Sequence, residues 1–450
     1  MVDPRPAARK LLIPLREPCV MTDPTDRYER STPRSRELFE EARDYLPGGD
    51  TREVTFHAPY PTFVEEASGT TLTTADGEEL LDFLNNYTAA VLGHAPEAVV
   101  EAVTERFARG SGFAAPTREA TELARRIVER TPSIDHVRFA NSGTEATMNA
   151  IRAAMVHTGN DDVLKVHGGY HGTHDTVMVG VDGDGPEAGV PREVGERVHT
   201  TPFNDPDALA AAFERHPDLA CFVVEPVMGH AGMVPATTEY LEAARDLTED
   251  TDTLLVFDEV MTYRLGVGGA QERYGVTPDL TALGKFIGGG LPAGAFGGRA
   301  DVMSVFDPSA EDGAIHSGTF NGNPATMAGG AATLDTLDAD AIARLNDLGA
   351  VARERLADAA ESVGVPVQVT GDGSFFNVHL TDSPVTDHAS SAAGDPATER
   401  LFLEMRNRGV FLAPRGMGNV TTPMDEVELD RLVGTFEEAL GDLSPEIAAD

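Results

Sequence analysis

Two stretches contain the residue types that carry out covalent carbonyl chemistry. Asp258 ends the apolar run 254–258, a pattern that indicates a buried strand, and Lys285 precedes a cluster of glycines. The chain has only two other lysines, Lys10 and Lys165. A desolvated lysine with a lowered pKa can attack a carbonyl carbon and form a Schiff base. The alternative is a lysine that merely extends from a strand end into water.

A second pattern is suited to an anion. Residues 141–146, Asn-Ser-Gly-Thr-Glu-Ala, follow a short predicted strand at 137–140 and open a predicted helix. Free N–H groups at the start of a helix, together with the hydroxyls of Ser142 and Thr144, form a site that a phosphate would fit. The alternative is ordinary capping of the helix by either hydroxyl.

The elements that must position these residues alternate between strand and helix. Tyr170, between glycines, follows a strand at 163–166 and could stack on a planar ring, or only pack. Glu225 ends the strand 221–225. This alternation predicts crossover units and a mostly parallel sheet, whose sites lie at the carboxyl ends of its strands. Beyond about 329 the pattern predicts a smaller terminal domain.

From about Arg36 to Leu440 the chain resembles the class III pyridoxal-phosphate-dependent aminotransferases of fold type I. The resemblance implies an α/β fold with a mostly parallel sheet in a large central domain and a smaller α+β domain from both termini. We expect four segments: a disordered or mis-started extension at 1–30 with translation beginning at Met21, a small-domain segment at 31–80, the large domain at 81–328 and the rest of the small domain at 329–450.

The resemblance also implies roles for individual residues. Lys285 would bond covalently to the cofactor and then transfer a proton on the substrate. The other implied cofactor contacts are Asp258 with the pyridine nitrogen, Val260 and Tyr170 with the two ring faces, Ser142, Gly143 and Thr144 with the phosphate, Thr319 with the phosphate from the partner subunit of a homodimer, and Glu225 as a support of the pocket.

Two subgroups of this family share features with the chain. The segments 258–262, 268–271, 274–281 and 294–299 are similar to glutamate-1-semialdehyde 2,1-aminomutases. By contrast, Asn85–Ala90 replaces the Ser-Trp-Gly-Pro segment of those enzymes, and the segment that follows Thr262 is one residue shorter than theirs. The segments 50–56, 85–90, 300–303, 316–320 and 413–416 are more similar to β-amino-acid aminotransferases of the β-phenylalanine type.

In the aminotransferase subgroup, arginines that match Arg52 and Arg415 bind substrate carboxylates, and Tyr87 lies in the segment that distinguishes the subgroups. A planar guanidinium suits a carboxylate, although surface ion pairing is the simpler alternative for both arginines. His230 takes the place of an asparagine near the phenolic oxygen of the cofactor in the aminomutases.

We therefore expect a transaminase that moves an amino group from a carboxylate-bearing amine, a β-amino acid, to a 2-oxo acid such as 2-oxoglutarate or pyruvate. The first alternative is the aminomutase, which transfers the amino group within one molecule to give 5-aminolevulinate. The second is a non-catalytic binding protein on the same scaffold, which would not need Lys285.

Composition limits the partners. The 450 residues include 74 acidic and 35 basic ones, a net charge of −39, which repels nucleic acid and anionic membranes. Charge spread over the whole chain indicates adaptation to high salt. Cys19 and Cys221 are the only cysteines, so we expect neither disulfides nor a metal site. A cytoplasmic enzyme is the expectation.

Overall fold

The computed structural model describes residues 23–183, 185–309, 313–391 and 396–447. Its centre is a seven-stranded sheet in which β12 runs antiparallel to both neighbours and every other pairing is parallel, as predicted. Across the sheet the strands are β4 (His136–Ala140), β12 (Gly294–Gly298), β11 (Leu280–Gly284), β10 (Leu254–Asp258), β7 (Leu219–Val224), β5 (Asp162–Val166) and β6 (Val198–Thr201).

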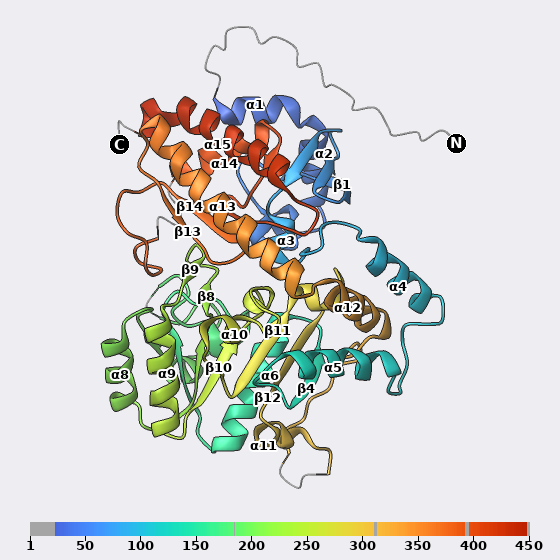
Figure 1. Ribbon diagram of the computed structural model, residues 1–450, viewed down its shortest axis with the longest axis vertical. Helices are drawn as coiled ribbons and strands as arrows, with labels where there is room; N and C mark the ends of the chain where they lie inside the picture. Colours follow the sequence, from blue (N-terminus) through green and yellow to red (C-terminus); the bar gives the residue numbers. More distant parts are fainter. Residues whose placement is uncertain (1–22, 184, 310–312, 392–395, 448–450) are drawn as a thin grey trace.

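Helices cover both faces of this sheet (Figure 1). In β7, Cys221 and Val223 face the core beneath α6 (Gly143–Thr158), whereas Phe222 and Val224 face the core beneath α8 and α9. The central strands are therefore apolar on both faces, which explains their continuous hydrophobic runs. The remaining helices of this region are α4 (Glu97–Phe107), α5 (Arg118–Arg130), α7 (Arg192–Gly195), α8 (Pro206–Arg215), α9 (Thr238–Asp250), α10 (Ala270–Tyr274), α11 (Ala300–Met303) and α12 (Pro324–Thr336).

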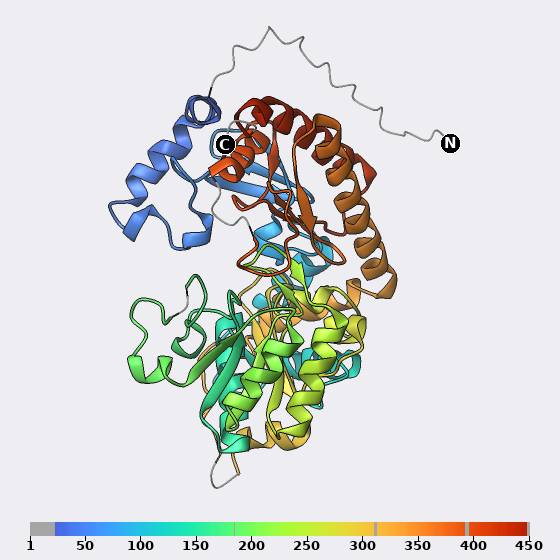
Figure 2. The same ribbon diagram turned by 90° about the vertical axis from the view of Figure 1, so that its left-hand side faces the viewer.

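A smaller α+β region combines both ends of the chain, as predicted (Figures 1 and 2). The parallel pairing of β3 with β15 joins the N-terminal and C-terminal segments in one sheet. Its elements are the sheet β1 (Val64–Ser68), β2 (Thr71–Thr74), β3 (Glu79–Asp82) and β15 (Val410–Phe411), the sheet β13 (Gln368–Thr370), β14 (Phe375–His379) and β16 (Met417–Asn419), and the helices α1 (Pro24–Ser31), α2 (Pro33–Ala42), α3 (Asn85–Thr88), α13 (Ala339–Val363), α14 (Pro396–Asn407) and α15 (Glu426–Ile447).

The expectation of a disordered or mis-started extension at 1–30 is wrong for residues 24–30, which are helical. Residues 24–31 form α1, and Tyr28 is fully buried, with its hydroxyl donating to the carbonyl of Tyr60 at 2.9 Å. The guanidinium of Arg406 lies 4.8 Å from the Tyr28 ring centroid and fixes α1 against α14. Met21 and the residues before it lie outside the described part of the chain. The other segment boundaries remain predictions.

The sequence patterns did not predict three strands of the central sheet, β6, β11 and β12. β12 reads Gly-Ala-Phe-Gly-Gly, a composition that does not favour a strand. A hypothetical Cβ at Gly298 would lie 2.2 Å from the carbonyl oxygen of Asp279, so the neighbouring backbone requires glycine there. β6 has only four residues, and β11 ends in Leu-Gly directly before the glycine-rich segment at Lys285, so neither stands out as an apolar run. Among the described residues, no helix combines the length and the apolar character needed to cross a membrane.

Candidate active site

The carboxyl ends of β7, β10 and β11 bring three ionisable side chains together. Asp258 is the last residue of β10, Glu225 follows β7, and Lys285 follows β11 with a left-handed φ of +54°. Burial lowers the pKa of Lys285 to about 8, although both carboxylates act to raise it. The amine is therefore neutral in a useful fraction of molecules near neutral pH, as a nucleophile requires.

Asp258 has a hydrogen-bond partner that the sequence analysis did not identify. The buried His171 places Nδ1 2.9 Å from Oδ2 of Asp258, and the amide of Val260 donates to Oδ1 at 3.0 Å. Burial lowers the pKa of His171, so its neutral ring donates from Nδ1 to the carboxylate of Asp258. The only sequence signal for His171 was its position next to Tyr170.

The predicted anion site lies at the start of α6. Ser142 caps this helix, because its Oγ accepts a hydrogen bond from the amide of Glu145 at 3.1 Å. Capping and phosphate binding are compatible, since the amides of Gly143 and Thr144 in the first turn have no acceptor within the helix. Thr144 Oγ1 accepts a bond from the amide of Thr173 at 3.3 Å.

Close packing holds this turn in place. A Cβ on Gly143 would lie 3.0 Å from the side chain of Val260, and a Cβ on Gly294 would lie 2.0 Å from the carbonyl oxygen of Ser142. Val260 therefore lies directly beside the helix start, and β12 supports the same turn from below. The contact of Val260 with a cofactor ring remains a prediction.

Glu225 and Tyr170 form a unit. The carboxylate of Glu225 accepts bonds from the amides of Tyr170 at 3.0 Å and Gly229 at 3.1 Å. Burial, reinforced by Asp258, raises the pKa of Glu225 to about 8. The ring of Tyr170 remains 43% exposed, with its centroid 5.9 Å from that of His230. Such a ring has a face available for stacking on a planar ligand.

Arg52 lies beside Tyr87 at the entrance to the site. Its Nη1 donates to Oδ1 of Asn86 at 2.8 Å, and its guanidinium carbon lies 5.8 Å from the Tyr87 ring centroid. The Tyr87 hydroxyl donates to the carbonyl of Val54. Burial raises the pKa of Tyr87, while Arg52 and Arg415 both act to lower it. The two arginines thus share one neighbour, as a common substrate region would require.

Arg415 is held by a hydrogen-bonded chain. Asp182 Oδ1 lies 2.9 Å from Nε2 of His230, and Nη1 of Arg415 lies 3.0 Å from Nδ1 of the same ring. Burial lowers the pKa of His230, so the neutral ring donates from Nε2 to Asp182 and accepts at Nδ1 from Arg415. His230 therefore contacts a predicted substrate residue, which sequence comparison did not indicate.

The loop with Thr319 touches the anion site of its own chain. Asn321 accepts a bond from Nδ2 of Asn141 at 2.8 Å, which fixes this loop next to the start of α6. Thr319 itself is exposed. Its predicted contact with a phosphate across a dimer therefore remains a prediction.

A cavity of about 860 Å³ lies next to this cluster. Its lining includes Arg52, Tyr87 and Phe286, the residue that follows Lys285. The cavity is large enough for a small organic acid, and Arg52 and Tyr87 are the predicted substrate residues that line it.

Residues 55–431 match the sequence pattern of Aminotransferase class-III, which covers most of the chain. The chain belongs to the class-III aminotransferases. This class-III enzyme is 41% identical over 391 residues to a glutamate-1-semialdehyde 2,1-aminomutase of Methanothermobacter thermautotrophicus, an alignment that covers 85% of this chain and 92% of the relative.

The solved structures that are similar to this chain include transaminases. An omega-transaminase from Sphaerobacter thermophilus is 40% identical with a TM-score of 0.89, covering 92% of this chain and 99% of that one. A beta-phenylalanine aminotransferase from Variovorax paradoxus is 36% identical with a TM-score of 0.89, covering 94% and 97%. A transaminase with bound pyridoxal phosphate is 36% identical with a TM-score of 0.87, covering 92% and 99%.

Pyridoxal phosphate is the cofactor of this class-III enzyme, and the residues fit it. The amine of Lys285 suits the aldehyde, the carboxylate of Asp258 suits a protonated pyridine nitrogen, and the turn at Gly143 suits the phosphate. His171 bonds to Asp258 through Nδ1, and its other ring nitrogen, the buried Nε2, has no hydrogen-bond partner among the described residues.

Proposed function

We propose that this class-III enzyme is a transaminase that takes the amino group of a β-amino acid and delivers it to a 2-oxo acid. The observation that carries the proposal is the pair of arginines around Tyr87. A transaminase binds two different carboxylates in turn, and a 2-oxo acid such as 2-oxoglutarate has two carboxylates at once. Two guanidinium groups at one entrance suit that requirement.

Lys285, Asp258 and Tyr170 would each have a separate role in the reaction. Bound pyridoxal phosphate supplies an electron sink that makes a proton on the neighbouring substrate carbon acidic. The neutral Nζ of Lys285 would accept that proton from the substrate carbon and hold it for transfer to the cofactor. Asp258, fixed by His171, holds a positive charge on the pyridine nitrogen. Tyr170, fixed by Glu225, limits movement of the ring.

Arg52 and Arg415 orient the substrate in this scheme. Each guanidinium is held by a neighbour that is neutral, Asn86 for one and His230 for the other. Neither hydrogen bond is an ion pair, and although Asp50 and Asp182 interact electrostatically with Arg52 and Arg415, each guanidinium keeps donors for a substrate carboxylate. This arrangement disfavours the alternative in which both arginines only form surface salt bridges.

The second candidate is glutamate-1-semialdehyde 2,1-aminomutase. The name of the relative from Methanothermobacter thermautotrophicus, at 41% identity, favours it. Other relatives with the same name, from Methanocaldococcus jannaschii and Methanopyrus kandleri, are 39% and 40% identical. Both candidates use the same lysine and cofactor, so the residues around Lys285 do not separate them. The arginines and Tyr87 favour the transaminase.

The deciding experiment uses the pyridoxal-phosphate form in high salt without any acceptor. We expect β-amino acids to bleach its visible absorbance and to release the matching 3-oxo acid. If the absorbance responds only to glutamate-1-semialdehyde and 5-aminolevulinate forms, the enzyme is the aminomutase. If neither compound produces a response, the scaffold is a binding protein.

Replacement of Arg52 tests the substrate contact. Arg52→Ala is expected to raise KM for carboxylate substrates about tenfold, since a charge-assisted hydrogen bond contributes about 1.5–3 kcal/mol. Arg118→Ala, which removes an exposed arginine on α5, is the control and should leave KM unchanged. An unaltered KM in Arg52→Ala would remove this residue from the site.

A further inference from the structure

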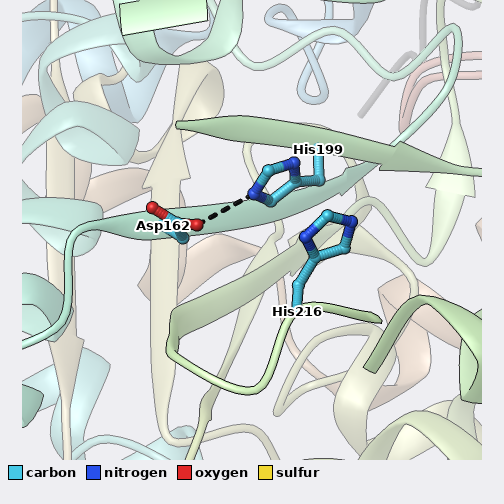
Figure 3. Close-up of side chains that lie close together, drawn as sticks. All are labelled: Asp162, His199 and His216. Carbon is cyan, nitrogen blue, oxygen red and sulfur yellow. Dashed lines mark hydrogen bonds and ion pairs between the residues drawn. The ribbon is translucent and has the colours of Figure 1, made fainter. Parts of the chain in front are cut away.

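Three potential metal ligands gather at the end of the sheet opposite to the active site. Asp162, His199 and His216 each offer a ligand atom, and these atoms lie within 4.8 Å of one another (Figure 3). Asp162 is the first residue of β5, His199 is the second residue of β6, and His216 follows α8 directly. The cluster therefore lies at the amino ends of these strands, whereas the active site uses their carboxyl ends.

The fold brings these side chains together for a simple reason. β5 and β6 are parallel, with Leu164 paired to His199, and Asp162 lies two residues before Leu164 on the same face. Leu164 packs in the core with Phe213 of α8. The helix therefore ends over this face of the sheet and delivers His216 to it.

The contacts within the cluster leave suitable donor atoms. Nε2 of His199 lies 3.0 Å from Oδ2 of Asp162, and the rings of His199 and His216 are nearly parallel with centroids 3.6 Å apart. Arg197 donates to Oδ1 of Asp162 at 3.0 Å. The two imidazole rings and the Asp162 carboxylate therefore offer three ligand atoms close together.

We propose that Asp162, His199 and His216 bind a divalent transition-metal ion, foremost Zn²⁺, with water in the remaining positions. Bonds of about 2.0–2.1 Å in a tetrahedral site place ligand atoms about 3.3 Å apart. The Asp162–His199 distance of 3.0 Å is close to this value, and the ligand atom of His216 lies within 4.8 Å of the other two. On binding, the Nε2 proton of His199 leaves to solvent and Nδ1 is protonated in its place.

The proposed ion would act as a structural cross-link. β6 is an edge strand of the seven-stranded sheet and pairs with β5 alone. Ligands from β5, β6 and the end of α8 would tie this edge to the helix that covers it. A metal that binds only the folded chain stabilises it by mass action, without any part in amino transfer.

The test is a titration of the chelator-treated holoenzyme with Zn²⁺ by calorimetry, together with thermal unfolding. We expect one ion per chain, a higher Tm with Zn²⁺, and visible d–d bands when Co²⁺ replaces it. His216→Ala and Asp162→Ala should each weaken binding by about tenfold or more and remove the gain in Tm. Amino transfer should be unchanged in both variants.

Two further variants make the assignment specific. Arg197→Gln should strengthen Zn²⁺ binding, because it removes a cation from Asp162. His388→Ala disrupts a second group with ligand spacing, Asp182, His230 and His388, and should leave the titration unchanged. The proposal is overturned if the wild type shows no saturable binding, if His216→Ala binds as the wild type does, or if His388→Ala alone loses the ion.

Discussion

At the scale of single residues, Lys285 has the property that its chemistry requires. Burial lowers its pKa to about 8, and only the neutral amine attacks an aldehyde. The covalent capture of added pyridoxal phosphate by the apoprotein should therefore accelerate as the pH rises and reach half of its maximal rate near pH 8. Stopped-flow absorbance measures this rate. Lys285→Ala should show no covalent capture and no turnover, while it still binds the cofactor.

Lys165 provides a control for this prediction within the same chain. Burial also lowers its pKa to about 8, but its Nζ donates to the carbonyls of Gly169 and Val179, both at 2.8 Å, and is fully buried. Reduction with borohydride followed by mass spectrometry should label Lys285 and leave Lys165 unlabelled. Label on Lys165 would show that a lowered pKa alone, without access, selects the reactive amine.

His230 is expected to position Arg415 rather than to touch the reacting atoms. His230→Leu removes the acceptor for Nη1 and should raise KM for carboxylate substrates about fivefold, which corresponds to one hydrogen bond of about 1 kcal/mol. His230→Gln can donate to Asp182 and accept from Arg415, so it should restore most of the affinity. A loss confined to kcat, with KM unchanged, would contradict the positioning role.

The pH dependence of KM supplies a second readout. Because burial lowers the pKa of His230, its ring stays neutral through the ordinary titration range of histidine and becomes protonated only at more acidic pH. A protonated Nδ1 would face the Arg415 guanidinium as a second donor. KM should therefore rise on the acidic side in the wild type but not in His230→Gln.

At the scale of elements, a buried arginine joins the large and small regions. Arg264 is fully buried, and its guanidinium donates to Oδ1 of Asn419 at 3.0 Å and to the carbonyl of Val420. Burial lowers its pKa to about 9. Arg264→Met should lower the free energy of unfolding by about 2–4 kcal/mol, since it leaves these acceptors unpaired.

The same variant should also affect the active site. Arg264 is one of the cations that lower the pKa of Lys285. Its removal should shift the pH dependence of cofactor capture to higher pH, because less repulsion opposes the protonated amine. Denaturant unfolding and the stopped-flow profile measure the two effects. Arg192→Met, which breaks an exposed pair with Glu196, is the control and should cost less than about 1 kcal/mol.

At the scale of the whole molecule, we propose a homodimer that forms around the loop of Thr319. Ile315 and Phe320 flank this threonine and are 84% and 63% exposed, an arrangement that favours burial by a second subunit. Ile315→Asp and Phe320→Asp should each produce monomers in sedimentation and weaken cofactor binding. Val427→Asp, at an exposed position on α15, is the control and should stay dimeric. A dimer in every variant would place the interface elsewhere.

The net charge of −39 leads to a second prediction at this scale. Self-repulsion among carboxylates destabilises the folded chain at low ionic strength, and salt screens it. We expect Tm to rise as KCl increases from dilute buffer to molar concentrations. Scanning calorimetry at fixed pH measures this dependence. A Tm that falls with salt would show that attractive ion pairs outweigh the repulsion.

The sequence alone determined the family and the local chemistry. Asp258 was recognisable because it ends the apolar run of β10, and Lys285 was recognisable as one of three lysines, placed just before a cluster of glycines. The start of α6 was also recognisable, because Ser142 and Gly143 are residue types that commonly begin a helix after a strand. Four of the seven strands of the central sheet, β4, β5, β7 and β10, were predicted within a few residues, because their apolar runs are local signals.

Only the tertiary structure decided contacts between residues far apart in the chain. His171 supports Asp258, and Asp182 supports Arg415 through His230, across separations that no local pattern encodes. The cluster of Asp162, His199 and His216 was missed because its members come from two strands and a helix end, not from a closely spaced motif. β12 was missed because its glycines follow from close backbone packing, which depends on neighbours that the fold brings together.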